Sequence, residues 1–184
     1  MSGELPCIKA GNKHLINKRG NVVFIGYDEH EKARFACLRG TGASFRMDCA
    51  GSDKRYGFNM SYSGSGRLYV FEAPIDALSH ATLENLITGD KSAWLRDNRL
   101  SLGGTSDLAL GKYLEMNPNV KEIVMCLDND DVGREASVSM ARKYADMGFH
   151  TRIELPTRKD YNEDLLAYEV ERVPQSVRSR GYER

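Results

Sequence analysis

The sequence has no apolar run long enough to cross a membrane. Its longest apolar stretches, residues 22–25 and 123–127, are far shorter than the roughly 20 residues of a membrane-spanning helix. The first residues also lack the basic and then apolar order that marks a secretory signal. We therefore expect a cytoplasmic protein with no membrane partner.

Cysteine is scarce and scattered along the chain. Cys7, Cys37, Cys49 and Cys126 include no Cys-x-x-Cys pair, and the four histidines are not clustered. These spacings are not those of a structural zinc site or of a disulfide framework. We expect buried free thiols, because unpaired cysteine is among the most buried residue types.

Over the whole chain, neither positive nor negative charge is in excess. The 26 Lys and Arg residues balance the 26 Asp and Glu residues, so no bulk positive field indicates a nucleic-acid partner. Residues 1–66 differ, because they hold ten basic and six acidic side chains. Within this part we predict that Arg39, Lys54 and Arg55 contact nucleic-acid phosphates.

Aromatic residues are interleaved with these basic residues: Phe24, Tyr27, Phe35, Phe45, Tyr56, Phe58 and Tyr62. Exposed rings would stack on nucleobases. In a small β domain, however, most alternating aromatic residues belong to the core. We therefore expect burial for most of them.

The pattern of apolar residues and turns predicts two kinds of structure. Residues 20–62 have short β segments separated by turns, which is typical of a small antiparallel β unit. Beyond a Gly- and Ser-rich stretch at 62–66, short apolar strands alternate with helical patterns. This predicts an α/β fold with a parallel sheet flanked by helices. We expect a small β-rich domain at 1–66, the α/β domain at 67–172 and a basic, flexible tail at 173–184.

The expected elements follow from these patterns and from the positions of Gly and Pro. In the β unit the strands are expected at 21–27, 33–38, 44–49 and 56–62. In the α/β part the strands are expected at 68–71, 99–102, 122–127 and 150–155. The helices are expected at 74–87, 106–116, 133–147 and 163–170.

Polar residues follow each predicted strand of the α/β part. Glu72 follows the first strand, Gly103, Gly104 and Thr105 the second, Asp128 and Asp130 the third, and Lys159 and Asp160 the fourth. Ligands of open parallel sheets bind at the carboxyl ends of the strands, so we expect these residues at one rim. Carboxylates gathered at one edge repel each other unless a hard cation lies among them, and oxygen ligands suit Mg²⁺.

The spacing of the acidic residues favours a shared ion. Asp128 and Asp130 project to the same side of an extended backbone, while Asn129 points away. Mg²⁺, or Mn²⁺ in its place, would keep coordination positions open for phosphate oxygens, which predicts phosphoryl-transfer or phosphodiester chemistry. Glu72 would then act as a general acid or base beside the metal.

Each of these features also has an ordinary structural interpretation. An Asp-x-Asp after a strand is common in loops, and Asp131 is the expected N-cap of the following helix. Gly103 and Gly104 can form a simple turn, and residues 160–164 can be a solvated helix start. The joint placement at consecutive strand ends favours the metal site over these interpretations.

Three segments that contain these residues resemble a known family. Residues 68–79 (LYVFEAPIDALS), 102–105 (LGGT) and 126–136 (CLDNDDVGREA) occur in this order. They are similar to the Toprim domain of bacterial primases, type IA and II topoisomerases, and some nucleases and recombination proteins. The resemblance covers residues 67–170. Residues 159–164 and the small preceding domain resemble the Toprim-like subgroup of plasmids and conjugative elements.

The resemblance implies roles for individual residues. Glu72 would be the catalytic acid or base, Asp128 and Asp130 would hold Mg²⁺ together with it, and Asp76, Gly133 and Arg134 would support the site. One departure is Ala73, because primases usually have Gly after the motif glutamate. The chain also lacks the zinc-binding pattern of full primases and the further domain that carries a topoisomerase tyrosine.

We therefore expect a Mg²⁺-dependent, primase-like or nuclease-like enzyme that acts on phosphodiester bonds. Its expected partner is DNA, single-stranded rather than double-stranded, or RNA, within a larger replication or mobilisation complex. The alternative is a non-catalytic nucleic-acid-binding or recombination-mediator module with a Toprim scaffold. An unrelated Mg²⁺ phosphotransferase or receiver-like domain would explain the acidic residues but not the ordered motifs.

Overall fold

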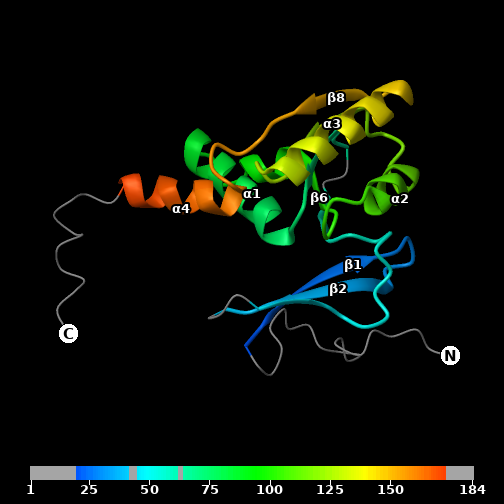
Figure 1. Ribbon diagram of the computed structural model, residues 1–184, viewed down its shortest axis with the longest axis horizontal. Coiled ribbons are helices and arrows are strands. Elements are labelled where there is room, and N and C mark those ends of the chain that lie inside the picture. Colours follow the sequence, from blue (N-terminus) through cyan, green and yellow to red (C-terminus); the bar gives the residue numbers. More distant parts are fainter. Residues whose placement is uncertain (1–19, 42–44, 62–63, 173–184) are drawn as a thin grey trace.

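The computed structural model describes residues 20–41, 45–61 and 64–172 (Figure 1). The described elements form a three-stranded sheet near the N-terminus and a five-stranded sheet flanked by helices. The expectations for Cys7, Tyr62 and the tail at 173–184 lie outside the described residues.

The small sheet is antiparallel, in the order β1 (Val22–Tyr27), β2 (Ala33–Arg39) and β3 (Arg46–Asp48). The Asp28 carboxylate closes the β1–β2 turn by accepting hydrogen bonds from the backbone of His30 and Lys32. Strand side chains alternate between two faces. One face forms its own small core, and the other, with Phe24 and Phe35, packs towards helix α1 (Pro74–Thr88) of the larger part. The expected antiparallel β unit is confirmed.

One expected strand belongs to the other sheet. We expected residues 56–62 to add a strand to the small unit, but only β4 (Asn59–Met60) forms there. This strand pairs antiparallel with β6 (Asn98–Ser101) at the edge of the five-stranded sheet. Pairing with a strand about forty residues away is not visible in the local pattern, which explains the error.

The larger sheet has the order β4-β6-β5-β7-β8. Its other strands are β5 (Arg67–Phe71), β7 (Glu122–Met125) and β8 (His150–Ile153). β5, β6, β7 and β8 are parallel. The four strand ends therefore lie at one edge, as expected.

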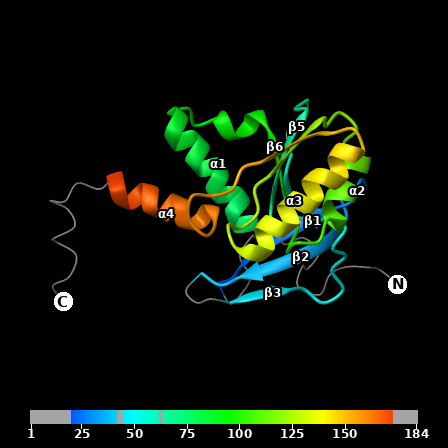
Figure 2. The ribbon, with the colours of Figure 1, turned by 45° about the horizontal axis from the view of Figure 1, so that its top comes forward.

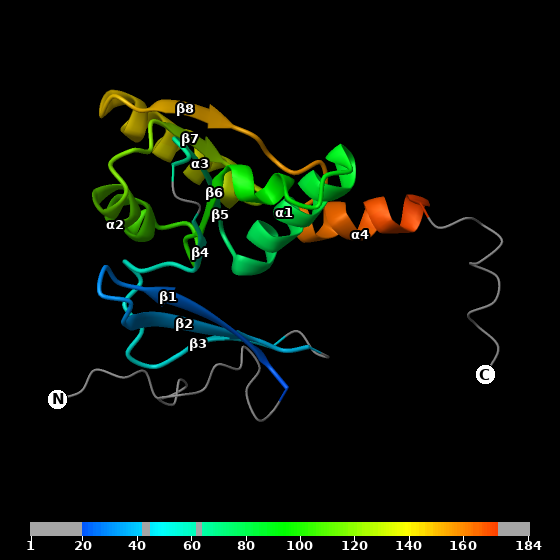
Figure 3. The same cartoon turned by 180° about the vertical axis from the view of Figure 1, so that it is seen from behind.

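Helices cover both faces of the larger sheet (Figures 2 and 3). Helices α2 (Leu108–Met116) and α3 (Asp131–Asp146) pack on the core that includes Val70 and Ile123. On the opposite face, α1 and α4 (Tyr161–Arg172) pack on the core around Phe71 and Val124. A short 3-10 helix, Ala93–Arg96, precedes β6. The result is the expected α/β architecture of a parallel sheet between helices.

The expectations for cysteine are met in part. Cys37 and Cys126 are free and buried. Cys49 is also buried but disulfide-bonded, which corrects the expectation of a free thiol at that residue. Among the helices of the described residues, none is both long and apolar enough to cross a membrane.

Candidate active site

Glu72 and Asp128 meet at the carboxyl edge of the larger sheet because β5 and β7 are neighbours. The backbone N–H of Asp128 donates to Oε1 of Glu72 at 3.3 Å. Both side chains are half-buried. This is the contact that the two strand ends predict.

The surroundings make both carboxyl groups harder to ionise. Burial raises the pKa of Glu72, and the charges of Asp128 and Asp130 raise it further. Burial also raises the pKa of Asp128, followed by the charges of Asp160 and Asp130. The four acidic groups therefore lie close enough to repel each other.

Asp130 begins the helix that follows the site. Its Oδ1 accepts the backbone N–H of Gly133 at 2.9 Å, so Asp130 is the N-cap of α3. This corrects the expectation for Asp131, which is the first helical residue and pairs with Arg134 at 2.6 Å. Arg134 also donates to the backbone and side-chain oxygens of Asn129. Arg134 thus stabilises the loop at residues 128–131 through Asn129 and Asp131.

Gly133 brings the first turn of α3 against Glu72 and Asp128. A Cβ at this position would lie 2.2 Å from the Asp128 carbonyl oxygen and 2.7 Å from Oε1 of Glu72. Real Cβ atoms do not come so close, so a larger residue would push the helix away from the carboxylates. The structure therefore explains why this position needs glycine.

The loop after β8 closes the other side of the site. The N–H of Asn129 donates to the Lys159 carbonyl oxygen at 2.7 Å, and the Asn129 side chain donates to Pro156. Asn129 thus points away from the carboxylates, as expected. The positive charge of Lys159 lowers the pKa of Asp128, while Asp160 raises it. Asp160 also caps α4 by accepting the N–H of Glu163 at 2.8 Å.

Asp76, in the first turn of helix α1, adds a fifth carboxyl group to the acidic group. Only 4% of this residue is exposed, and its Oδ1 accepts the N–H of Asn162 at 3.3 Å. Burial, followed by the charges of Asp160 and Asp128, raises the pKa of Asp76 to about 7. The sequence did not single out Asn162, whose contribution is a backbone group and leaves no signal in residue type.

The glycine turn after β6 approaches both Glu72 and the small sheet. The N–H of Gly104 donates to the Glu72 carbonyl oxygen at 3.1 Å. Gly103 has a φ of 70°, a backbone conformation that favours glycine. Together with Thr105 and Lys54, the turn lines a cavity of about 190 Å³. Lys54 also pairs with Asp48 at 2.9 Å.

Two arginines of the small sheet lie near enough to the acidic group to act on its charges. Arg39 and Arg46 are direct cross-strand partners, an arrangement of like charges that costs stability. Arg46 lowers the pKa of Glu72 and of Asp128, and Arg39 lowers that of Asp76. Within the described parts of the chain, neither arginine forms an ion pair, and Nε of Arg39 is buried without a hydrogen-bond partner.

Sequence reasoning missed Arg46 as a site residue, because its proximity to Glu72 comes from the packing of the two sheets. The third predicted phosphate contact, Arg55, lies elsewhere and is held by Asp53 at 2.7 Å.

The donor set suits a hard divalent cation in its chemistry. Glu72, Asp128 and Asp130 offer only carboxylate oxygens, which are the ligands of Mg²⁺ and Mn²⁺, and a cation would relieve the repulsion that raises the pKa of Glu72. The arrangement of the three carboxylates fits a metal ion only in part, because one Asp130 oxygen caps α3. Over residues 20–41, 45–61 and 64–172, no three His, Cys, Asp or Glu side chains are placed to hold a metal ion.

The chain matches two protein families. A Toprim-like family matches residues 69–165, and a family described as a protein of unknown function (DUF3991) matches residues 7–71. The chain therefore belongs to the Toprim-like family, with a domain of unknown function before the Toprim-like part. Among curated proteins there is no match.

Several solved primase structures have a similar fold. The primase fragment of the bacteriophage T7 primase-helicase protein is 19% identical, with a TM-score of 0.59 over 82% of this chain and 60% of that fragment. A DnaG primase catalytic domain bound to ssDNA is 14% identical, with a TM-score of 0.57 over 90% of this chain and 56% of that domain.

A DNA primase domain from Pseudomonas aeruginosa is 16% identical, with a TM-score of 0.56 over 87% of this chain and 50% of that domain. At these identities the likeness establishes the fold. The chain spans between half and about 60% of these three structures.

Proposed function

We propose that the protein is a Mg²⁺-dependent enzyme of the Toprim class that makes or cleaves phosphodiester bonds in nucleic acid. The observation that carries this proposal is that carboxylate and guanidinium groups lie near each other at one edge of the larger sheet. Glu72 and Asp128 lie there as half-buried carboxylates. Arg39 and Arg46 of the small sheet, which form no ion pair within the described residues, lower pKa values in the same acidic group. Carboxylates suit a cation and guanidinium groups suit phosphate oxygens, so the two kinds of group together favour a phosphate bound through a cation.

Glu72, Asp128 and Asp130 would hold Mg²⁺, or Mn²⁺ in its place. The bound ion would supply stabilisation of the negative charge on the phosphate and open positions for phosphate oxygens. The raised pKa of Glu72 brings this carboxyl group nearer to the working pH. That is the property of a general acid or base, so Glu72 would move the proton of the attacking or leaving oxygen.

Arg39 and Arg46 would bind the phosphate on the side opposite the carboxylates. Paired guanidinium groups suit phosphate oxygens, and a bound phosphate would also relieve their mutual repulsion. Lys54, which lines a cavity together with Gly103 and Gly104, would bind a neighbouring phosphate. Asp76, Gly133, Arg134, Lys159 and Asp160 would hold these groups in position.

Single-stranded DNA is the favoured substrate, because one of the similar folds is a primase domain bound to ssDNA. RNA is the alternative. The order of the two family matches supports our proposal that the protein serves a plasmid or conjugative element. We further propose that it works in the cytoplasm, within a larger replication or mobilisation complex.

A gel assay tests the proposed reaction. Labelled single-stranded DNA is incubated with nucleotides, Mg²⁺ or Mn²⁺, and the protein or its Glu72→Gln and Asp128→Asn variants. We expect products that are shorter or longer than the substrate, formed at least about a hundredfold more slowly by either variant because an acid–base group or a ligand is lost. An Arg39→Gln, Arg46→Gln double variant should need more DNA for the same rate. Equal product from all proteins would contradict the proposal.

A non-catalytic binding module is the second candidate. One observation favours it: Oδ1 of Asp130 is engaged as a helix cap, which leaves fewer carboxylate oxygens for a cation. In this case DNA would change mobility on the gel without changing length, and Glu72→Gln would bind it as well as the unaltered protein.

A further inference from the structure

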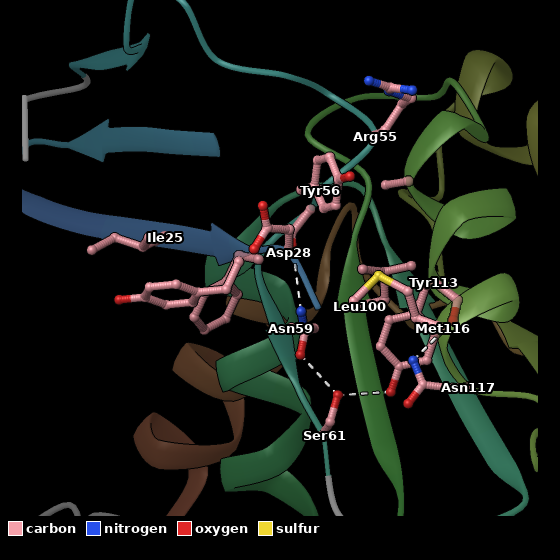
Figure 4. Close-up of a pocket in the computed structure, with 14 residues that line it drawn as sticks. Ile25, Asp28, Arg55, Tyr56, Asn59, Ser61, Leu100, Tyr113, Met116 and Asn117 are labelled. Carbon is pink, nitrogen blue, oxygen red and sulfur yellow. Dashed lines mark hydrogen bonds between the residues drawn. The ribbon is translucent and has the colours of Figure 1, made fainter. Parts of the chain in front are cut away.

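A second pocket lies between the small sheet and the edge of the larger one (Figure 4). Its volume is about 330 Å³, at the lower end of the range of small-molecule sites, about 300–1,000 Å³. Its walls come from the end of β1, residues 55–61, β6 and the end of α2. None of the carboxylates of the candidate active site lines it.

The backbone fixes the position of Tyr56 in this pocket. A Cβ at Gly26 would lie 1.9 Å from the Tyr56 carbonyl oxygen, and a Cβ at Gly57 would lie 2.1 Å from the Ser101 carbonyl oxygen. The two glycines thus allow the chain at Tyr56 to lie in main-chain contact with β1 on one side and β6 on the other. An aromatic ring held in advance loses little freedom when a ligand stacks on it.

Three cationic side chains surround the Tyr56 ring. The Arg34, Lys112 and Arg55 cations lie 5.5, 5.8 and 5.9 Å from its centroid. Arg55 is committed to Asp53 at 2.7 Å. Arg34 and Lys112 approach their nearest carboxylates at only 3.8 and 3.5 Å, which is beyond a good hydrogen bond. These long ion pairs leave the two cations able to exchange a carboxylate for a phosphate.

The remaining lining combines fixed polar groups with an apolar floor. Ser61 donates to Oδ1 of Asn59 at 2.8 Å, and the Tyr113 hydroxyl lies 2.7 Å from Ser61. The side chain of Asn117 donates to the Tyr113 carbonyl oxygen, which leaves its own oxygen as an acceptor. Ile25, Leu100 and Ala109 line the pocket beside them. Apolar walls with a few amide and hydroxyl groups, and the one carboxylate of Asp28, suit a flat heterocycle with polar edges.

The pocket is connected to the candidate active site through β6. The Ser101 N–H donates to the Phe58 carbonyl oxygen at 2.8 Å. The Ser101 hydroxyl donates to the backbone carbonyl oxygen of Glu72 at 3.2 Å. Residue 58 is therefore two strands away from Glu72, or about 10 Å. One extended nucleic-acid strand can reach both places.

We infer that this pocket binds one nucleobase of single-stranded DNA, stacked on Tyr56, with the adjoining phosphate held by Arg34 and Lys112. The inference rests on the proposed function, because it adds a binding site for the same strand. The site is separate from the carboxylates, so it acts in binding and not in the reaction.

Binding of a fluorescent oligothymidine, followed by anisotropy, tests the inference. Tyr56→Ala should weaken binding about tenfold, the usual effect of losing one base–aromatic stack, while Tyr56→Trp should retain it. Tyr168→Ala is the matched control, since Tyr168 also has an arginine, Arg172, over its ring at 5.3 Å but lies on α4. Replacing Arg34 or Lys112 by Gln should reduce the slope of log affinity against log salt by about 0.7.

Photocrosslinking of the unaltered protein gives a readout that does not depend on variants folding. An oligonucleotide with 5-iododeoxyuridine should crosslink to the peptide that contains Tyr56. Crosslinks that map elsewhere, or equal affinities of the Tyr56→Ala and Tyr168→Ala variants, would overturn the inference and leave the proposed function intact. If the unaltered protein binds no single-stranded DNA, both fail.

Discussion

Asp76 is a carboxyl group whose surroundings oppose its ionisation from several directions. It is 4% exposed, and the acidic groups of Asp160 and Asp128 lie near it. Arg39 and the N–H of Asn162 compensate only in part, since the pKa of Asp76 is still raised to about 7. At neutral pH this one residue is therefore about half protonated, and its charge state depends on any cation that enters the site.

The Asp76→Asn variant tests this account of the acidic group. The pKa of Asp76 is about 7 in the folded protein and near 3.8 in the unfolded chain. The folded state binds the proton more tightly, so stability falls as the pH rises between these values. Asp76→Asn should remove this slope and raise the free energy of unfolding at pH 8 by up to about 4 kcal/mol.

Urea unfolding from pH 4 to pH 8 measures the effect of Asp76→Asn. The control is Asp131→Asn, because the Asp131 side chain is fully exposed. Stability curves of the Asp76→Asn variant and the unaltered protein that run parallel over this range would refute the account.

Among the secondary-structure elements, the first turn of α3 fixes the positions of Glu72 and Asp128. The helix begins directly after the Asp128–Asp130 loop, and Asp130 caps it through Gly133. The same glycine packs against the Asp128 carbonyl and the Glu72 side chain. The N-terminus of this helix and the ends of β5 and β7 thus form one tightly packed unit.

Gly133→Ala should damage this unit. The added methyl group meets atoms at 2.2 and 2.7 Å, so we expect a loss of about 1–3 kcal/mol of stability, as for other overpacked sites, together with loss of the reaction. Gly111→Ala is the matched control, because Gly111 is also helical and its Cβ would have only an ordinary contact at 3.7 Å. That change should stabilise the protein by up to about 1 kcal/mol. Thermal unfolding of both variants checks the prediction, and equal effects would contradict it.

The sequence predicted most elements because their signals are local. The first helix was expected at 74–87 and spans Pro74–Thr88, since Pro74 starts it and Gly89, with a φ of 70°, follows its end. The strand expected at 122–127 spans Glu122–Met125. The strand at Asn59–Met60 was assigned to the wrong sheet, because two residues carry too little pattern to reveal a distant partner.

At the scale of the whole molecule, the candidate site is built by two sheets. The larger sheet brings Glu72 and Asp128 together, which consecutive strand ends in the sequence were enough to predict. The small sheet adds Arg39 and Arg46, and their approach to the acidic group depends on how the two sheets pack. The sequence offered only a surplus of basic residues before residue 67, so it predicted Arg39 but not Arg46.

Calorimetric titration with Mn²⁺ or Mg²⁺ tests the central claim that Glu72 and Asp128 form a divalent-cation site. The unaltered protein should bind one ion, and Asp128→Asn and Glu72→Gln should each weaken binding about tenfold or more, because each removes a carboxylate oxygen donor. Asp131→Asn, a change in the same loop at a fully exposed side chain, should bind as tightly as the unaltered protein. Equal binding by all four proteins, or binding by none, would contradict the account.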